Sequence, residues 1–393
     1  MLLFYERSAY FYSQLLEVKV MAAHPIEVFC CRNVDCPDFR IRGKGNLRWH
    51  GWSGHSHRIR GICCRTCRKY FSERKGSVFE QSRLPEEKVE SLLEHLREGC
   101  GVRQTARLIH VNQNTVTRYA RLAGNHAVLV HDELVAFSPQ TREVQFDEKW
   151  SFVFKKEANC TPEGENCGDN WDHIAIDAES RLVLSVVPGK RTAENCLQLV
   201  EDVSKRTKGR TDLLLTSDEH APYQTAIEKV YATEVAQPKR PGPGRPPNPK
   251  RVMPNDLCYA TVRKTRKKGR VVDVKRTVVF GTLELLILWL ARSIVSSFIN
   301  TAFIERLNAT DRGQNARKTR KSYRFSKNWE MHNAMTYFVA LSYNFRWPVR
   351  TLRIKDDREK WKDRTPAMAA GLTDHVWTIH EWISFPALPV RST

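Results

Sequence analysis

The sequence has no long hydrophobic run and no signal-peptide pattern at its start. The longest apolar stretch, residues 283–291, already contains Glu284. It is far shorter than the roughly 20 residues that a membrane-spanning helix needs, so we expect no membrane span. Glu6 and Arg7 interrupt the apolar start of the chain, and no basic region precedes it, which predicts a protein that stays inside the cell. Residues 1–20 are either an upstream extension set by the choice of start codon or an ordinary terminal helix.

Acidic residues are scarce relative to basic ones. The chain of 393 residues has 44 Asp and Glu against 64 Lys and Arg, which leaves a net charge of +20. A hydrophobic fraction of 41% supports buried cores and excludes a wholly disordered chain, and the length suits two or three domains. The basic excess favours a polyanionic partner.

Cysteines are few outside one short segment. Six of the eleven lie within residues 30–67, and this clustering, with the odd total, argues for a local site rather than a disulfide framework. Two pairs with four and two intervening residues are separated by 27 residues. This spacing is typical of a structural zinc ribbon, because tetrahedral Zn²⁺ takes four thiolates from two tight turns. The expected ligands of one zinc ion are Cys31, Cys36, Cys64 and Cys67.

Some neighbouring residues remain alternatives at this site. Cys30 and Cys63 each adjoin an expected ligand and could substitute for it, or they are small buried residues on the strands that enter the turns. His50, His55 and His57 lie in the intervening loop and could compete, although a loop histidine is more often solvated.

Helical spacing of apolar residues over residues 84–125 predicts a compact three-helix unit. The last two helices flank a turn at residues 110–112, as in a helix-turn-helix, which lays its second helix in the major groove of DNA. An ordinary helical hairpin is the alternative. We expect Asn112 to cap the second helix, with Val116 and Tyr119 turned to the core. The outward polar residues expected to contact DNA are Gln113, Asn114, Thr117, Arg118 and Arg121.

After residue 139 the pattern changes to period-two alternation and short apolar runs, which predicts an α/β domain. Residues 238–249 hold six prolines in twelve positions, so they form a stiff exposed spacer that interrupts this domain. Two basic strand-like stretches follow. We then expect a helix over residues 283–307, a basic loop, and a second helix over residues 328–345.

Three acids in this domain are candidates for a metal site. Asp147 lies within a strand and Asp218 ends another, where α/β folds place their chemistry. Glu305 lies on a helix whose i+3 and i+7 positions, Asn308 and Arg312, form one polar face. Clustered carboxylates repel one another unless divalent cations neutralise them, and oxygen ligands suit Mg²⁺ or Mn²⁺. Two such ions can support an in-line phosphodiester displacement. Spacing alone, however, does not distinguish these three residues from the other acids among the 44 in the chain.

Longer motifs supply a resemblance. In chain order they are FDEKW at 146–150, TSDEHAPY at 216–223, NTAFIERLNATDR at 300–312, RKSYRFSKNWEMHNAMTYFVALSYNF at 320–345 and TPAMAAGLTDHVW at 365–377. With the cysteine pairs and the helix-turn-helix before them, they resemble the transposases of the insertion sequence 1 family and their single-chain relatives. The resemblance extends from Cys30 to Trp382.

That resemblance implies a ribonuclease-H-like domain with a DDE triad at Asp147, Asp218 and Glu305, and it selects the same four zinc ligands. Asp172 and Asp177 are competing acids of lower rank. The fold class is therefore multidomain. Its expected parts are an N-terminal extension (1–27), a zinc ribbon (28–80), a helix-turn-helix DNA-binding domain (84–126), an α/β ribonuclease-H-like catalytic domain (140–350) with a basic insertion (238–280), and a C-terminal tail (351–393).

The function implied is DNA transposition. The enzyme would bind the terminal inverted repeats of a mobile element, cleave phosphodiester bonds with two Mg²⁺ or Mn²⁺ ions, and join the freed ends to target DNA. It would act as a homo-oligomer on nucleoid DNA in the cytoplasm of a bacterial or archaeal cell. The alternatives are a non-catalytic DNA-binding regulator that retains the fold and a nuclease that cuts without strand transfer.

Basic segments supply further candidate DNA contacts. Residues 238–276 hold 13 Lys and Arg against 2 Asp, with a Gly-Arg-Pro turn that resembles the core of a minor-groove AT-hook; a plain electrostatic arm is the alternative. Residues 317–327 interleave Tyr323 and Phe325 with charges, which suits a DNA end held by phosphate contacts and stacking, unless both rings belong to the core. The remaining expected DNA contacts are Arg245, Lys267, Lys268, Asn308, Arg312, Arg320, Lys321, Arg324 and Lys327.

Overall fold

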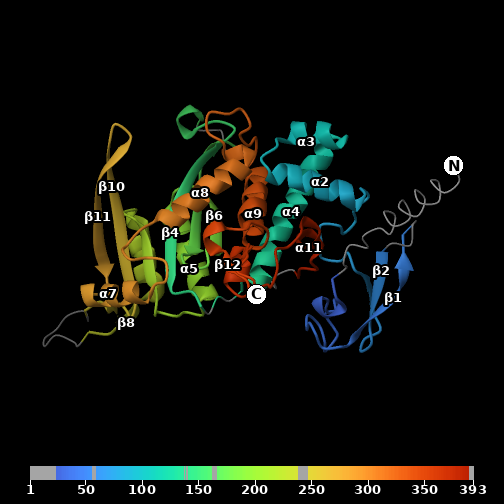
Figure 1. Ribbon diagram of the computed structural model, residues 1–393, viewed down its shortest axis with the longest axis horizontal. Helices are drawn as coiled ribbons and strands as arrows, with labels where there is room; N and C mark the ends of the chain where they lie inside the picture. The colour runs from blue at the N-terminus through green and yellow to red at the C-terminus, as the bar shows by residue number, and fades with distance from the viewer. Residues whose placement is uncertain are drawn as a thin grey trace. The chain divides into compact units, whose positions relative to one another are not determined.

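The computed structural model of the chain divides into two compact units (Figure 1). The first comprises residues 1–86 and 377–393, and the second comprises residues 87–376. The structure describes residues 24–54, 59–136, 138, 140–161, 166–237 and 247–388. Arg245, His55, His57 and residues 1–23 of the N-terminal extension lie outside these ranges. Within them, no helix combines the length and the apolar character needed to cross a membrane.

The first unit contains a three-stranded antiparallel sheet in the order β1-β2-β3. Its core joins the cysteine-bearing turns to Phe29 and Ile62. The last part of the chain completes this unit, because the backbone N–H of Val78 donates to the carbonyl oxygen of Ile383 in helix α11 at 2.9 Å. The elements of this unit are η1 (Ile26–Val28), β1 (Leu47–Ser53), β2 (Ile59–Cys64), β3 (Tyr70–Ser72) and α11 (Ile379–Ser384).

The second unit is built on a six-stranded mixed sheet in the order β11-β10-β7-β4-β5-β6 (Figure 1). Strands β4, β5 and β6 are antiparallel neighbours, whereas β7 runs parallel to β4 and β10 runs parallel to β7. Strand β11 returns antiparallel to β10, so the two basic strand-like stretches form a hairpin at the edge of the sheet. The strands are β4 (Glu143–Val153), β5 (Gly168–Asp177), β6 (Val183–Gly189), β7 (Leu214–Asp218), β10 (Cys258–Lys267) and β11 (Arg270–Phe280). The expected α/β class is confirmed.

Side chains of β4 alternate between the two faces of this sheet. On one face, the ring of Phe146 packs against Tyr223 of α6, with 5.5 Å between ring centroids. On the other face, Lys149 pairs with Asp311 of α8. Helices therefore cover both faces: α5 (Ala193–Arg206) and α6 (Ala221–Tyr231) lie on the Phe146 side, and α8 (Ala302–Gln314) and α9 (Trp329–Arg346) on the Lys149 side.

The three-helix region precedes the sheet. Its helices are α2 (Glu86–Arg97), α3 (Val102–Ile109) and α4 (Gln113–Leu134). As predicted, Val116 and Tyr119 are buried, and the Asn112 side chain caps α4 by accepting a hydrogen bond from the backbone N–H two residues on, at 2.8 Å. Helix α4 extends well beyond the predicted unit and packs along α9. A Cβ at Gly124 would clash with the backbone of Ala334, so this close helix contact requires glycine.

The single helix predicted over residues 283–307 is wrong. Helix α7 covers only Leu283–Arg292, and α8 begins after a non-helical segment. The hydroxyl groups of Ser293 and Ser296 donate to the carboxylate of Glu143 at 3.1 and 2.8 Å. These bonds give the serines a partner outside the helix and hold the segment in a non-helical conformation. The helix predicted before the C-terminal region, α9, is confirmed.

Short elements complete the second unit. They are η2 (Glu157–Asn159), β8 (Thr233–Val235), β9 (Lys250–Val252), η3 (Ala316–Lys318), η4 (Arg350–Leu352), β12 (Ile354–Lys355), β13 (Trp361–Lys362) and α10 (Pro366–Ala369). Strands β8 and β9, which precede and follow the proline-rich segment, pair antiparallel. Cys160 and Cys167 form a disulfide.

Candidate functional site

The predicted catalytic acids lie where β4 and β7 run parallel. Gln145 on β4 is opposite Thr216 on β7. Because side chains on one face repeat every two residues, Asp147 and Asp218 are level with each other on the same face. Carboxylate oxygens of Asp147, Asp218 and the adjacent Glu148 all lie within 4.8 Å of one another. The structure thus brings together two of the three predicted acids and adds Glu148.

Negative charge is concentrated at Asp147. The pKa of its carboxyl group is raised to about 7, first by burial and then by the charges of Asp218, Glu148 and Glu305. Burial and Asp218 also raise the pKa of Glu148. Two hydrogen bonds offset part of this charge, because Asn308 Nδ2 donates to Asp147 Oδ2 at 2.7 Å and the backbone N–H of Glu148 donates to Oδ1 at 2.9 Å. A bound cation would offset the remainder.

Glu305 lies in the first turn of α8 and is more exposed than Asp147 or Asp218. Its carboxylate is ion-paired with Lys264 of β10 and accepts a hydrogen bond from Thr301 Oγ1 at 2.7 Å. Its charge is close enough to raise the pKa of Asp147. Among the described residues, however, the group with ligand atoms within 4.8 Å contains Asp147, Glu148 and Asp218 but not Glu305.

The three grouped carboxylates fit a hard divalent cation. Mg²⁺ binds oxygen at about 2.0–2.1 Å in octahedral geometry, which places its ligands roughly 3 to 4 Å from one another. The separations within the acidic cluster of Asp147, Glu148 and Asp218, all at most 4.8 Å, need only a small adjustment of side chains to reach this range. Carboxylate oxygens are also the ligands that Mg²⁺ and Mn²⁺ prefer.

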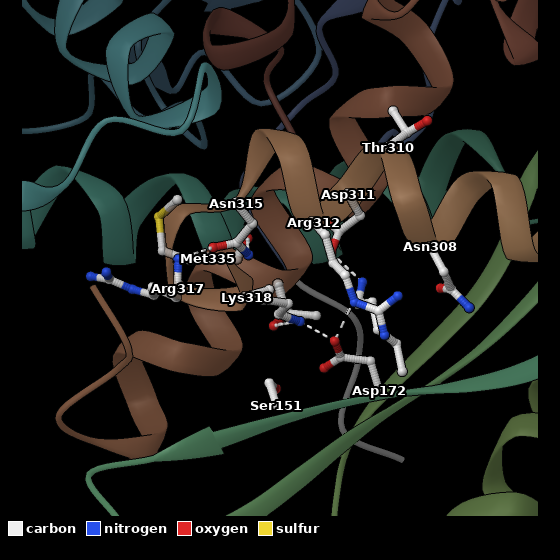
Figure 2. Close-up of polar contacts among 12 residues, drawn as sticks. Ser151, Asp172, Asn308, Thr310, Asp311, Arg312, Asn315, Arg317, Lys318 and Met335 are labelled. Atoms are coloured by element: carbon white, nitrogen blue, oxygen red, sulfur yellow. Dashed lines mark hydrogen bonds and ion pairs between the residues drawn. The ribbon is translucent and has the colours of Figure 1, made fainter. Parts of the chain in front are cut away.

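A buried ionic network holds α8 against the sheet. Lys149 of β4 pairs with Asp311 of α8, and its Nζ lies 3.5 Å from Asp172 Oδ2 on β5. Lys318 pairs with the same Asp172 and donates to Thr336 Oγ1 at 2.7 Å. Figure 2 shows Asp172, Asp311 and Lys318 converging from the sheet and from the chain around α8. The four charged side chains are at most 4% exposed and carry two charges of each sign, so no net charge is buried.

The competing acids have internal partners. Asp172 belongs to the ionic network described above. Asp177 is buried and accepts hydrogen bonds from the Thr141 hydroxyl at 2.9 Å and from the backbone N–H groups of Glu179 and Ser180 at 2.7 and 3.1 Å. Both carboxylates thus have hydrogen-bond or ion-pair partners within the fold.

The four expected zinc ligands converge in the first unit. The sulfur atoms of Cys31, Cys36, Cys64 and Cys67 all lie within 4.8 Å of one another, with 3.5 Å between Cys31 and Cys67 and 3.9 Å between Cys36 and Cys64. Four thiolates bound at about 2.3 Å to a tetrahedral Zn²⁺ are roughly 3.8 Å apart, so this four-cysteine cluster fits zinc. A hydrogen bond from the backbone N–H of Lys69 is the main cause that lowers the pKa of Cys67 to about 7, whereas burial raises the pKa values of Cys31 and Cys36. A bound metal ion would offset this by stabilising the thiolates.

Cys30, Cys63 and His50, which were the described alternatives to these ligands, lie outside the group of four sulfur atoms. Cys30 and Cys63 are both buried. The Cys63 thiol contacts the carbonyl oxygen of Cys64 at 3.5 Å. His50 packs against Tyr70, with 4.5 Å between ring centroids.

The predicted DNA-reading face of α4 is only partly exposed. Gln113, Asn114 and Arg118 are exposed, whereas Thr117 is half-buried and donates to the carbonyl oxygen of Gln113 at 3.1 Å. Arg121 is also half-buried and pairs with Glu330 of α9 at 3.1 Å. A hollow of about 360 Å³ follows this face, lined by Asn114, Thr117, Arg118, Arg121, Leu122 and Asn125.

The other predicted DNA contacts lie on the β10–β11 hairpin and in the loop after α8. Lys267 and Lys268 are exposed at the tip of the hairpin. In the loop, the exposed cations are Arg320, Lys321, Arg324 and Lys327, and Arg324 also donates to the carbonyl oxygen of Gly99 at 3.0 Å. Asn308 is buried and bonds to Asp147, and Arg312 is half-buried nearby.

The two aromatic residues of that loop differ. Tyr323 is 88% exposed, so its ring is available for stacking. Phe325 packs against Phe152 of β4, with 4.9 Å between ring centroids, and Lys327 lies over its ring. Tyr323 is therefore placed as the stacking hypothesis requires, whereas Phe325 packs against the sheet, as the core alternative requires.

Comparison with known proteins gives weak matches. No protein-family model and no curated protein matches the chain. Among solved structures, the chain is similar to the Mos1 strand transfer complex and to the Mos1 mariner paired end complex with Mn, at 16% identity and a TM-score of 0.16 for each. The matches cover 38% of this chain and 55 and 56% of those chains, little more than half their length. A TM-score this low does not establish a shared fold.

Proposed function

We propose that this chain is a DDE-type transposase of the kind found in the insertion sequence 1 family. In this proposal it binds the ends of a mobile element, cleaves phosphodiester bonds with Mg²⁺ or Mn²⁺, and transfers the freed 3′ ends to target DNA. The observation that carries the proposal is the acidic cluster, in which Asp147 and Asp218 meet level with each other on parallel strands. The charge of Glu305 also acts on Asp147.

The sheet topology supports the expected ribonuclease-H-like domain. The strand order β6-β5-β4-β7-β10, with β4, β7 and β10 parallel and β5 antiparallel to β4, is the order that such a domain has. Strand β10, the last strand of this order, lies within residues 238–280, so the expected insertion includes a strand of the sheet itself. Strand β11 pairs with β10 and adds a basic strand at the edge of the sheet. The predicted metal ligands thus lie on the two central parallel strands and on a helix that packs on the same face.

The side chains have separate roles in this proposal. Bound divalent cations would supply an activated attacking oxygen and stabilise the leaving oxygen. Asp147 and Asp218 hold the metal site, and Asn308 orients Asp147 through its 2.7 Å hydrogen bond. Glu305 completes the site by exchanging its pairing with Lys264 for the cation.

The cationic surfaces fit a nucleic acid partner. The exposed residues of α4, the tip of the β10–β11 hairpin and the loop after α8 would contact phosphates or base edges. The four-cysteine cluster would hold one structural Zn²⁺ that stabilises the first unit. Assembly of several copies on DNA, with Arg245 as a further contact, belongs to the same proposal.

The experiment is cleavage and joining of a labelled terminal fragment of the element, with Mg²⁺ and then with Mn²⁺. Asp147→Asn, Asp218→Asn and Glu305→Gln should each lower cleavage and strand transfer by orders of magnitude while end binding survives, because the charge that holds the metal is lost. Glu219→Gln is the matched control, since Glu219 is exposed beside Asp218 and pairs only loosely with Arg263, at 3.6 Å. It should stay within a few-fold of wild type.

The outcomes separate the alternatives. Near wild-type cleavage by Asp147→Asn or Asp218→Asn would refute the DDE assignment, and binding without any cleavage by the wild type would favour a regulator. Cleavage without joining would indicate a nuclease. If Glu305→Gln alone retained activity, Glu148 would replace Glu305 as the third acid to be tested.

A further inference from the structure

A second group of metal-ligating side chains lies on the opposite face of the sheet from Asp311 and α8. It consists of Glu148 on β4, Cys196 on α5 and His220 just before α6. Their ligand atoms all lie within 4.8 Å of one another. Cys196 is fully buried, and neither it nor His220 has a role in the proposed reaction.

Two atoms of this group are buried without a hydrogen-bond partner among the residues that the structure describes. They are Glu148 Oε1 and His220 Nε2, which are 3.8 Å apart, too far for a hydrogen bond to each other. Glu148 is only 8% exposed, and its other oxygen pairs with Arg191 at 3.1 Å. The Tyr223 hydroxyl interacts with the Glu148 carboxylate, so His220 Nε2 is the atom of this group that most needs a partner. Buried polar atoms without partners are unfavourable and rare in folded proteins, so this nitrogen, facing Glu148 and Cys196, indicates a site for a ligand.

We propose that Glu148, Cys196 and His220 bind one transition-metal ion of borderline softness, such as Zn²⁺. A carboxylate, a thiolate and an imidazole are ligands that Zn²⁺ takes together, whereas Mg²⁺ does not take a thiolate. Zinc-to-ligand distances of about 2.0 to 2.3 Å place ligands roughly 3.3 to 3.7 Å apart in a tetrahedron, close to the 3.8 Å between Oε1 and Nε2. The carboxylate and the thiolate together offset both charges of the ion.

This Glu-Cys-His site is distinct from the four-cysteine cluster and does not depend on the proposed reaction. It joins three elements, β4, α5 and the start of α6. The backbone N–H of His220 donates to Asp218 Oδ1 at 3.1 Å, so an ion held by His220 would also fix the end of β7 beside the acidic cluster. Glu148 belongs to both groups.

The test uses the full chain and Co²⁺ as a spectroscopic probe. One equivalent of Zn²⁺ first fills the four-cysteine cluster, where it is retained because Zn²⁺ binds more tightly than Co²⁺. Co²⁺ bound at the acidic cluster would give no thiolate band, because that cluster contains only carboxylates. Co²⁺ is then titrated while the near-ultraviolet charge-transfer absorption from thiolate to cobalt is recorded. The wild type should gain this band at one equivalent, and Cys196→Ala should not. Cys258→Ala, which removes an equally buried cysteine of β10, should keep it.

Two further variants guard against a folding defect. His220→Ala should retain the band but require at least roughly tenfold more Co²⁺, as expected when a group that supports a metal is lost. Cys196→Ser, which preserves the size of the side chain, should lack the band while its far-ultraviolet circular dichroism matches the wild type. Absence of the band in the wild type, or its persistence at wild-type affinity in Cys196→Ser or His220→Ala, would overturn the proposal.

Discussion

The buried ionic network predicts that Lys149 contributes far more stability than an exposed lysine. Lys149→Met preserves the length of the side chain but removes its charge. The Lys149 side chain is fully buried between Asp311 and Asp172, so the variant leaves two buried carboxylates to share Lys318. Removing one partner of a buried ion pair destabilises a protein by about 3–5 kcal/mol. At roughly 2–4 °C per kcal/mol for a large domain, the unfolding midpoint should fall by about 6 to 20 °C.

A double-mutant cycle isolates the charge interaction. Asp311→Leu alone should be similarly destabilising, because it leaves Lys149 without its closest partner. The double variant Lys149→Met/Asp311→Leu replaces the pair with apolar side chains, a change that is often nearly neutral. It should therefore be more stable than the sum of the single changes indicates, with a coupling energy of roughly 1–3 kcal/mol.

The assay is thermal and denaturant unfolding followed by circular dichroism, for the wild type, both single variants and the double variant. The matched control is Lys355→Met, because the Lys355 side chain is 51% exposed and pairs with the exposed Glu359. An exposed pair is worth about 0–1 kcal/mol, so the control should change little. If Lys149→Met changed the free energy of unfolding by less than about 1 kcal/mol, the network would not be what anchors α8 to β4.

Three further predictions follow from other parts of the chain. Cys64→Ser should lose stoichiometric zinc and unfold the first unit, as measured by metal content and protease sensitivity; a folded zinc-free variant that binds DNA specifically would contradict this. Arg118→Ala should relax sequence preference in binding assays, whereas Lys267→Ala should weaken binding to all DNA alike and reduce its salt dependence; equal losses on specific and random duplexes for both would remove the recognition-helix assignment. Burial alone would raise the pKa of Asp172, but two buried lysines hold it well below its ordinary range. Its stabilising effect should therefore be complete above about pH 4 and be lost as the pH falls, so the stability difference between wild type and Asp172→Asn should shrink in acid denaturation.

Features that depend on residues close in sequence were predictable. The cap at Asn112 and the buried positions of Val116 and Tyr119 follow from a helical repeat a few residues long. The end of α7 was not predictable in this way. It depends on the hydrogen bond from Ser293 to Glu143, which is 150 residues earlier in the chain. The apolar pattern of the helix does not indicate that partner.

The candidate site was likewise predictable only where it depends on residues close in sequence. The strand-end position of Asp218 and the motif around Asp147 identified two residues that the structure brings together. Glu148 was missed, although its place beside Asp147 in a largely buried strand was a signal. Lys149 was a second signal, since a lysine in such a strand needs an acidic partner, but nothing local indicates that this partner is Asp311, 162 residues away.

The alternation of side chains along β4 limits how the chain can change in length. Deletion or insertion of one residue within Glu143–Val153 would reverse the faces of all the side chains that follow it. If the change lies before Asp147, this residue would point toward α6, and Glu148 would take its place opposite α8. Changes in length are therefore excluded from this strand, even where each new residue is chemically acceptable. The exposed strands β8 and β9 carry none of the residues of the three metal-ligand groups, so a change in length between these two strands reverses no side chain of those groups.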